Sequence, residues 1–165
     1  MRCMLLSTLS LSVLLACAPP AEEPPAAPAV DTLAVEQGVA DLWNRVVFAD
    51  TSGDAATMVG LYAETARIDV RGFPPILGRA AIDSTLRAVF AQYDYTDMRV
   101  MPSTTVVLSN ELAYQDGAFL ETYTQRGKAP MTDHGRYATA VAKGADGQWR
   151  FAYFIGFVDS TVAKR

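Results

Sequence analysis

The stretch GFPPILGRAAIDSTLRAVFAQYDYT, residues 72–96, separates a helical part of the chain from a strand-rich part. It begins with Gly72-Phe73-Pro74-Pro75, which predicts a loop because proline lacks an amide donor and restricts the residue before it. Gly78-Arg79 then opens a predicted helix. Apolar residues at helical spacing form one side of that helix: Ile82, Leu86, Val89 and Phe90.

Before this stretch, the pattern predicts two helices and one strand. The first helix has Asp31 or Thr32 as its N-cap, and Asp50-Thr51-Ser52-Gly53-Asp54 ends it. Its apolar residues recur at helical spacing: Val35, Val39, Leu42, Trp43, Val46 and Val47. Asp54 can cap a short second helix with Met58, Leu61 and Tyr62 on one face. A strand is predicted over Ala66 to Val70.

After this stretch, residues 95–157 have the composition of long strands. Three runs of turn-forming residues separate them: Ser109-Asn110, Gln125-Arg126-Gly127-Lys128 and Gly144-Ala145-Asp146-Gly147. Such spacing is typical of consecutive antiparallel hairpins. Three helices followed by a curled meander predict the α+β class.

The first residues predict export and a lipid anchor. Residues 1–16 hold Arg2, an apolar run too short to cross a bilayer, and Leu14-Leu15-Ala16 directly before Cys17. This ending resembles the lipobox of bacterial lipoproteins, which implies cleavage before Cys17 and its lipidation. Ala18 after the cysteine implies the outer membrane, facing the periplasm. Residues 17–31 then form a predicted Pro/Ala-rich tether with too little apolar area to fold.

Composition restricts the remaining residues, 32–162, to one domain. Half of the chain is hydrophobic, and Cys3 and Cys17 are its two cysteines, so we expect no disulfide in the domain. The formal net charge is -4, and the basic residues are scattered. We therefore expect no nucleic-acid partner.

Four segments in this order resemble the SnoaL-like and ketosteroid-isomerase-like superfamily, also called nuclear-transport-factor-like or cystatin-like: Gly53-Asp54, Leu61-Tyr62-Ala63, Gly72 to Ile82, and Asp146-Gly147-Gln148-Trp149-Arg150. The resemblance implies a cone in which a curved antiparallel sheet wraps around a long N-terminal helix, with two shorter helices and an apolar pocket at the open end. It also implies a possible homodimer. It implies no single activity, because the fold hosts isomerases, cyclases, dehydratases and non-catalytic members.

The isomerase pattern is only partly present. In these enzymes a carboxylate removes a proton beside a carbonyl, while a tyrosine and a protonated acid bind the oxyanion. The resemblance implies Asp69 as the base, but it places Val46 at the tyrosine position. No carboxylate lies between Thr139 and Val141, where the protonated acid is expected. Steroid-type isomerisation is therefore disfavoured.

Three titratable residues are the candidate catalytic groups of a cofactor-free lyase or isomerase: Asp69, Asp116 and His134. Asp69 either faces a pocket or pairs with Arg67, which shares its strand face. Asp116 either faces a pocket with a buried partner or lies at a bulge or edge beside Gly117. His134, the one histidine, either exchanges protons with Asp116 or Asp69 or is an exposed hairpin residue.

Aromatic residues from separate elements are candidates for a ligand pocket or for the core: Trp43, Tyr62, Tyr114, Tyr123, Tyr137, Tyr153 and Phe154. Hydroxyl groups around an apolar cavity suit a small apolar or amphipathic molecule. One histidine and no free cysteine predict no metal site, and the chain has no phosphate-binding glycine motif that would predict a nucleotide cofactor. We therefore expect a ligand-binding domain without a cofactor, with the lyase or isomerase and a non-catalytic dimerising module as alternatives.

Overall fold

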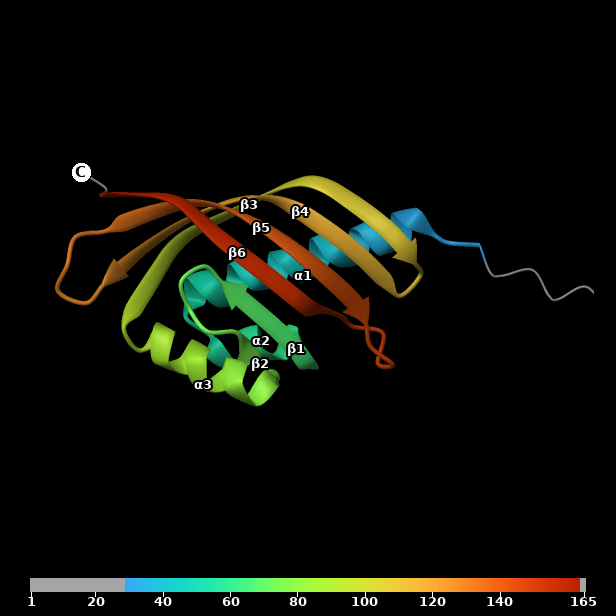
Figure 1. The fold of residues 1–165 in the computed structure, drawn as a ribbon, viewed down its shortest axis with the longest axis horizontal. Helices are drawn as coiled ribbons and strands as arrows, with labels where there is room; N and C mark the ends of the chain where they lie inside the picture. The colour runs from blue at the N-terminus through green and yellow to red at the C-terminus, as the bar shows by residue number, and fades with distance from the viewer. Residues whose placement is uncertain (1–28, 164–165) are drawn as a thin grey trace, which may run out of the picture.

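The computed structural model describes residues 29–163. The predicted signal peptide, Cys17 and nearly all of the tether lie outside these residues. None of the helices in the described part is both long and apolar enough to span a bilayer. Figure 1 shows the elements in chain order: α1 (Thr32–Ser52), α2 (Ala55–Gly60), β1 (Tyr62–Val70), β2 (Ile76–Leu77), α3 (Arg79–Phe90), β3 (Tyr93–Ser109), β4 (Leu112–Gln125), β5 (Met131–Lys143) and β6 (Trp149–Ala163).

The strands form one mixed sheet of six, in the order β2-β1-β6-β5-β4-β3. The α+β prediction is confirmed, and β3 to β6 form the expected antiparallel meander. The sheet as a whole is not antiparallel, because β1 runs parallel to β6. A parallel pair needs a long connection, and residues 71–148 between these two strands supply it.

The ends of the first two helices follow local chemistry. The Ala34 N–H donates to the Asp31 carboxylate at 3.0 Å, which confirms Asp31 as the N-cap of α1. Gly53 ends the helix in the left-handed conformation, with φ of 66°, that glycine adopts without strain. The Thr57 N–H donates to Asp54 at 3.0 Å, so Asp54 caps α2 as predicted.

Two predicted boundaries differ from the structure. Tyr62 belongs to β1 rather than to the second helix, because it pairs with Phe151 of β6. The strand expected from Ala66 therefore begins four residues earlier. The two-residue strand β2 was not predicted from the proline-rich loop; it pairs with β1 through Ile76 and Leu77. The three predicted turn regions all connect consecutive strands, although Ser109 and Gln125 are themselves the last residues of β3 and β4.

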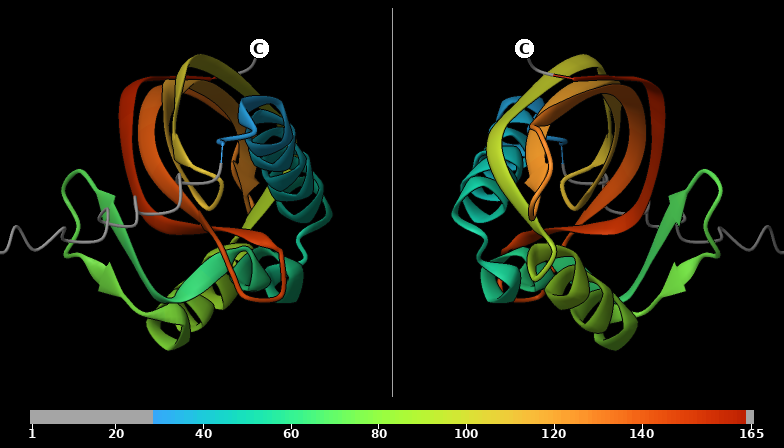
Figure 2. Two further views of the ribbon diagram at one scale, coloured as in Figure 1. Left: turned by 90° about the vertical axis from the view of Figure 1, so that its right-hand side faces the viewer. Right: turned by 90° about the vertical axis from the view of Figure 1, so that its left-hand side faces the viewer.

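Helix α1 packs against the concave side of the bent sheet, which curls around it (Figure 2). The buried positions of the helix are Val35, Val39, Leu42, Trp43, Val46, Ala49 and Asp50. Val47, expected among them, is half-buried. Gly38 lies directly against the Trp149 indole, so that a side chain at this position would collide with the ring. The close contact joins α1 to the start of β6.

We predict that Trp43→Ala lowers the free energy of unfolding by about 3 to 5 kcal/mol, because the indole is buried and its removal leaves a cavity. Trp43 is 6% exposed and its Nε1–H donates to Gln115 Oε1 at 2.6 Å. Phe73→Ala is the matched control, since Phe73 is 71% exposed. Urea denaturation measures both, and equal stabilities for the two variants would contradict this packing.

Candidate functional site

A cavity of about 620 Å³, here called the main cavity, opens between α3, the loop before β2, and the end of the sheet where β3 and β5 begin. Its volume is that of a site for a small organic molecule. The lining residues are Trp43, Val70, Phe73, Pro74, Ile76, Thr85, Val89, Tyr93, Tyr95, Met98, Phe119, Glu121, Tyr123, Asp133, Tyr137, Phe154, Gly156 and Val158.

Aromatic rings form two walls of the main cavity. On the α1 side, the ring centroids of Trp43 and Tyr137 lie 4.7 Å apart, and Tyr137 stacks on Phe154 at 6.4 Å. On the β3 side, Tyr123 lies 5.6 Å from Tyr93 and 5.8 Å from Tyr95. Ring pairs at these separations stabilise one another beyond the burial of their area.

A smaller recess of about 170 Å³, the inner recess, adjoins the main cavity. The two share the lining residues Trp43, Val89, Tyr95, Met98, Glu121 and Phe154. Asp50, from the last turn of α1, also lines the recess and is 5% exposed. Its Oδ2 atom is buried without a hydrogen-bond partner, and burial raises the pKa of this carboxyl to about 7.

Glu121 of β4 lies where the main cavity meets the inner recess. Burial, followed by the nearby charges of Asp50 and Asp133, raises the pKa of its carboxyl to about 8. Among the described residues, Glu121 takes part in no ion pair. A carboxyl group with this pKa stays largely protonated at neutral pH and can either donate a hydrogen bond or release a proton.

Asp133, at the start of β5, is the second acid in the lining of the main cavity. The hydroxyl of Thr161 donates to its carboxylate at 2.6 Å, and the hydroxyl of Tyr123 approaches the same oxygen at 3.4 Å. These two contacts hold Asp133 in place. Across residues 29–163, no group of three or more histidine, cysteine or acidic residues is arranged to hold a metal ion.

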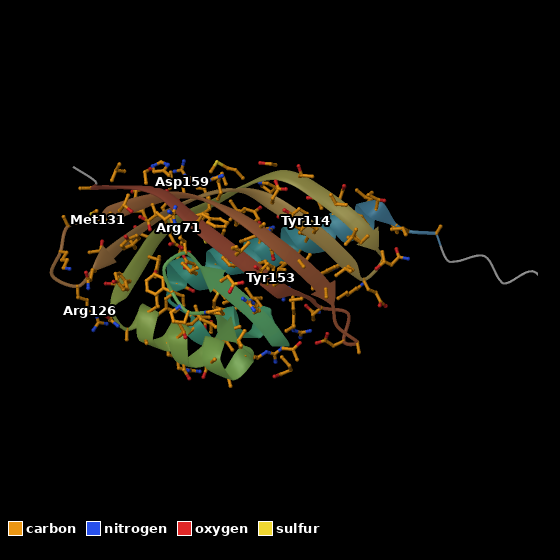
Figure 3. The ribbon with its side chains drawn as sticks, in the orientation of Figure 1. Arg71, Tyr114, Arg126, Met131, Tyr153 and Asp159 are labelled. Carbon is orange, nitrogen blue, oxygen red and sulfur yellow. The ribbon has the colours of Figure 1, made fainter. Side chains whose placement is uncertain are left out.

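Five of the seven aromatic residues proposed from the sequence lie at these sites. Trp43, Tyr123, Tyr137 and Phe154 line the main cavity, and Tyr62 lines the inner recess. The remaining two, Tyr114 and Tyr153, do not line either. Tyr114 is 37% exposed and alternates with the buried Ala113 and Gln115. Figure 3 shows Tyr114 near the α1 start, far from the sheet end that carries Met131.

The three proposed catalytic residues do not line the main cavity or the inner recess. Asp69 bonds to Arg67 at 2.8 Å and accepts from the Tyr153 hydroxyl at 2.8 Å, and both contacts lower its carboxyl pKa. This is the same-face pairing that strand alternation allows. Figure 3 shows the position of Tyr153 along β6.

Asp116 and His134 also lie apart from these sites. Asp116 shares its strand face with Tyr114, opposite the buried Gln115, and lines a shallow outer depression with Arg136. His134 is exposed, whereas its neighbour Asp133 faces the main cavity. The structure therefore brings none of the three proposed groups to the cavity.

Sequence reasoning missed Glu121 and Asp50 for different reasons. Glu121 is two residues from Phe119 and from Tyr123 and so shares their strand face, which means that the sequence carried a signal for an acid on an aromatic face. The alternation of side chains along β4 did not by itself determine which face of the strand meets the helix. Asp50 stood in a polar run that ends α1, so its burial depended on tertiary packing against β3 and β4.

We predict that Glu121→Gln flattens the dependence of stability on pH. The carboxyl pKa is about 8 in the folded protein against 4.5 ordinarily, so the folded state disfavours ionisation and wild-type stability falls as pH rises between these values, by about 1 kcal/mol per unit. The amide cannot ionise, so the variant should gain stability relative to wild type from pH 6 to pH 8.5. Urea unfolding checks this, with Asp116→Asn as control; parallel curves for wild type and Glu121→Gln would refute it.

Solved structures with the same fold include enzymes and proteins without a stated activity. A ketosteroid isomerase-like protein from Erwinia carotovora atroseptica has a TM-score of 0.66 at 18% identity, covering 78% of this chain and 95% of its own. A hexachlorocyclohexane dehydrochlorinase from Novosphingobium barchaimii has a TM-score of 0.70 at 15% identity, covering 81% of this chain and 92% of its own. A domain of unknown function with a cystatin-like fold from Nostoc punctiforme has a TM-score of 0.62 at 15% identity, covering 78% of this chain and 80% of its own.

At these identities the similarity to solved structures establishes the fold alone. No curated protein matches the chain. The family model of the SnoaL-like domain, however, matches residues 31–155, which is most of the chain and includes the residues of the main cavity up to Phe154. The chain belongs to the SnoaL-like domain family.

Proposed function

We propose that this protein is a lipid-anchored envelope protein whose SnoaL-like domain binds a small, mainly apolar molecule in the main cavity. The observation that carries the proposal is the cavity itself: about 620 Å³ in volume, walled by aromatic and aliphatic side chains. Its two acidic lining residues are Glu121 and Asp133. Apolar walls with few polar groups are the usual character of small-molecule sites.

The walls provide enough apolar surface for useful affinity. A ligand that buries about 200 Å² of its own apolar surface gains about 5 kcal/mol from leaving water. Part of that gain is offset by the lost freedom of the ligand. The rings in the walls also pack against one another, with the centroids of Trp43 and Tyr137 4.7 Å apart, and this packing restricts their side-chain freedom before a ligand binds.

The start of the described chain is held at the end of the sheet opposite the cavity opening. The Asp31 N–H donates to Asn110 Oδ1 at 2.7 Å, and Asn110 Nδ2 donates to the Ala29 carbonyl at 3.1 Å. These bonds hold the described start of the chain against the β3–β4 turn. That turn lies at the opposite end of the sheet from the β4–β5 loop, near which the main cavity opens (Figure 1). The described chain therefore begins at the end of the sheet opposite the opening of the main cavity, an arrangement compatible with ligand entry from solvent.

The two sequence-based alternatives differ in their support. A lyase or isomerase that uses Asp69, Asp116 and His134 has no common cavity for these groups. A dimerising module is favoured by four exposed apolar side chains around the β3–β4 turn: Val106, Leu108, Leu112 and Tyr114. Assembly through this surface stays a prediction that sedimentation equilibrium tests, and it is compatible with ligand binding at the other end of the sheet.

We predict that Val158→Trp reduces the affinity for tert-butylbenzene, a neutral apolar probe, at least tenfold. Val158 lines the main cavity and is 41% exposed, so an indole at this position fills the cavity opening without disturbing the core. Val162→Trp is the matched control, because Val162 is 49% exposed on the same strand and does not line the cavity. Titration calorimetry measures both, and equal affinities would place the probe elsewhere.

We predict that Cys17→Ser releases the protein from membranes and abolishes incorporation of labelled fatty acid. The hydroxyl of serine cannot take the place of the thiol that is lipidated, and stable attachment depends on the buried acyl chains. Membrane fractionation after labelling checks both results. Unchanged membrane association of the variant would exclude the lipoprotein assignment, whatever the domain binds.

A further inference from the structure

The ionisable lining of the main cavity holds acids and tyrosines without a basic side chain. Its lining contains two acids, Glu121 and Asp133, and no lysine, arginine or histidine. Asp50 adds a third acid in the inner recess, whose lining also holds no basic residue. The six ion pairs among the described residues lie elsewhere and involve none of these three acids. Among the described residues, the linings of the two sites therefore combine acidic groups with apolar walls and hold no basic side chain.

The buried oxygen of Asp50 points independently to a missing partner. Asp50 is 5% exposed, its Oδ2 atom has no hydrogen-bond partner, and the side chain lines the inner recess. Buried polar atoms are nearly always paired in native proteins, because an unpaired one loses its interaction with water and gains nothing in return. An unpaired carboxyl oxygen beside a second acid is best satisfied by a positively charged group.

The walls supply a second feature that a cation favours. Eight of the lining residues are aromatic: Trp43, Phe73, Tyr93, Tyr95, Phe119, Tyr123, Tyr137 and Phe154. The face of an aromatic ring carries negative electrostatic potential and attracts an ammonium group within about 6 Å of its centroid. Tyr95 and Trp43 line both the main cavity and the inner recess, as Glu121 does. The rings of Trp43 and Tyr95 and the carboxyl group of Glu121 thus all lie where the main cavity meets the inner recess.

We propose that the main cavity takes an organic cation, a molecule with an apolar body and a substituted ammonium group, whose charge lies beside Glu121 and Asp50 while its body contacts the aromatic walls. The proposal rests on the proposed function, because it assumes that a small, mainly apolar molecule occupies this cavity. Beyond the proposed function, it specifies that the ligand is positively charged and that Glu121 and Asp50 recognise this charge. An anionic ligand of the same shape would find no basic partner in this lining and would be repelled by each acid that is ionised.

Binding of such a cation releases a proton. Burial keeps Glu121 mostly protonated at neutral pH, since it raises the pKa of the carboxyl to about 8. The charge of an ammonium group favours the ionised carboxylate, so the proton passes to the buffer as the ion pair forms. The titratable groups that face Glu121 are Asp50 from α1, Tyr62 from β1, Tyr95 from β3, Tyr123 from the same face of β4 and Asp133 from β5. The residues of α3 that line the cavity, Thr85 and Val89, do not titrate.

Two probes of nearly identical shape test the charge directly. Phenyltrimethylammonium carries a permanent positive charge, and tert-butylbenzene replaces its nitrogen with carbon. We expect the wild-type domain to bind the cation at least tenfold more tightly than the hydrocarbon at pH 8.5. The affinity for the cation should rise by up to tenfold per pH unit between pH 6 and pH 8, while that for the hydrocarbon stays constant. Titration calorimetry in two buffers of different ionisation enthalpy should show proton release for the cation only.

Two variants test whether Glu121 and Asp50 cause the preference for the cation. Glu121→Gln should lower the affinity for phenyltrimethylammonium at pH 8.5 at least tenfold and leave that for tert-butylbenzene within about threefold. Asp50→Asn should lower the affinity for the cation in the same direction, and it serves if Glu121→Gln fails to fold. Asp116→Asn is the matched control, because Asp116 lies on the other face of β4 from Gln115 and the cavity.

The outcomes separate this inference from the function on which it rests. Equal affinities for the two probes, or a cation preference that survives both Glu121→Gln and Asp50→Asn, would overturn the inference and leave an apolar site standing. If tert-butylbenzene also fails to bind, or Val158→Trp does not affect it, the proposed function is overturned as well. If Glu121→Gln abolishes both the proton release and the preference for the cation, the result would support the inference and the proposed function together.

Discussion

The side chain of Gln115 holds the helix and the sheet together. Its Oε1 atom accepts from the Trp43 indole at 2.6 Å and from the Tyr137 hydroxyl at 2.9 Å, and its Nε2–H donates to Thr105 at 2.8 Å. One buried amide thereby connects α1 with β3, β4 and β5. Because each polar atom in the network would lose its partner if the helix shifted, these bonds favour the observed register of the helix on the sheet.

That register determines where the cavity lies. Trp43 and Tyr137, which meet at Gln115, also line the main cavity, so the network fixes one of its walls. Towards the start of α1 the packing is closed, because Gly38 allows the Trp149 ring to lie directly on the helix. Towards the other end the sheet extends past the end of the helix (Figure 1). There the main cavity lies between the sheet, α3 and the loop before β2. The same helix thus closes one end of the fold and leaves the other available to a ligand.

The acids inside this space oppose stability. Burial raises the carboxyl pKa to about 7 for Asp50 and to about 8 for Glu121, which means that the folded state disfavours their ionised forms. An apolar residue at either position would avoid this effect. Ionisable groups that line a cavity and lower the folding stability are characteristic of functional sites, where burial shifts their pKa values. Asp69, paired with Arg67 away from the cavity, has its carboxyl pKa shifted in the opposite direction.

Local patterns in the sequence determined the helices, their caps, the turns between strands and the α+β class, because each depends on residues close together in the chain. The aromatic character of a pocket could also be predicted, as Trp43, Tyr123, Tyr137 and Phe154 show. Only the tertiary structure decided which face of β4 meets the helix, and that choice places Glu121 inside and Asp116 outside. Strand alternation separates the two faces but does not say which one is buried, because burial depends on the register between α1 and strands far away in the chain.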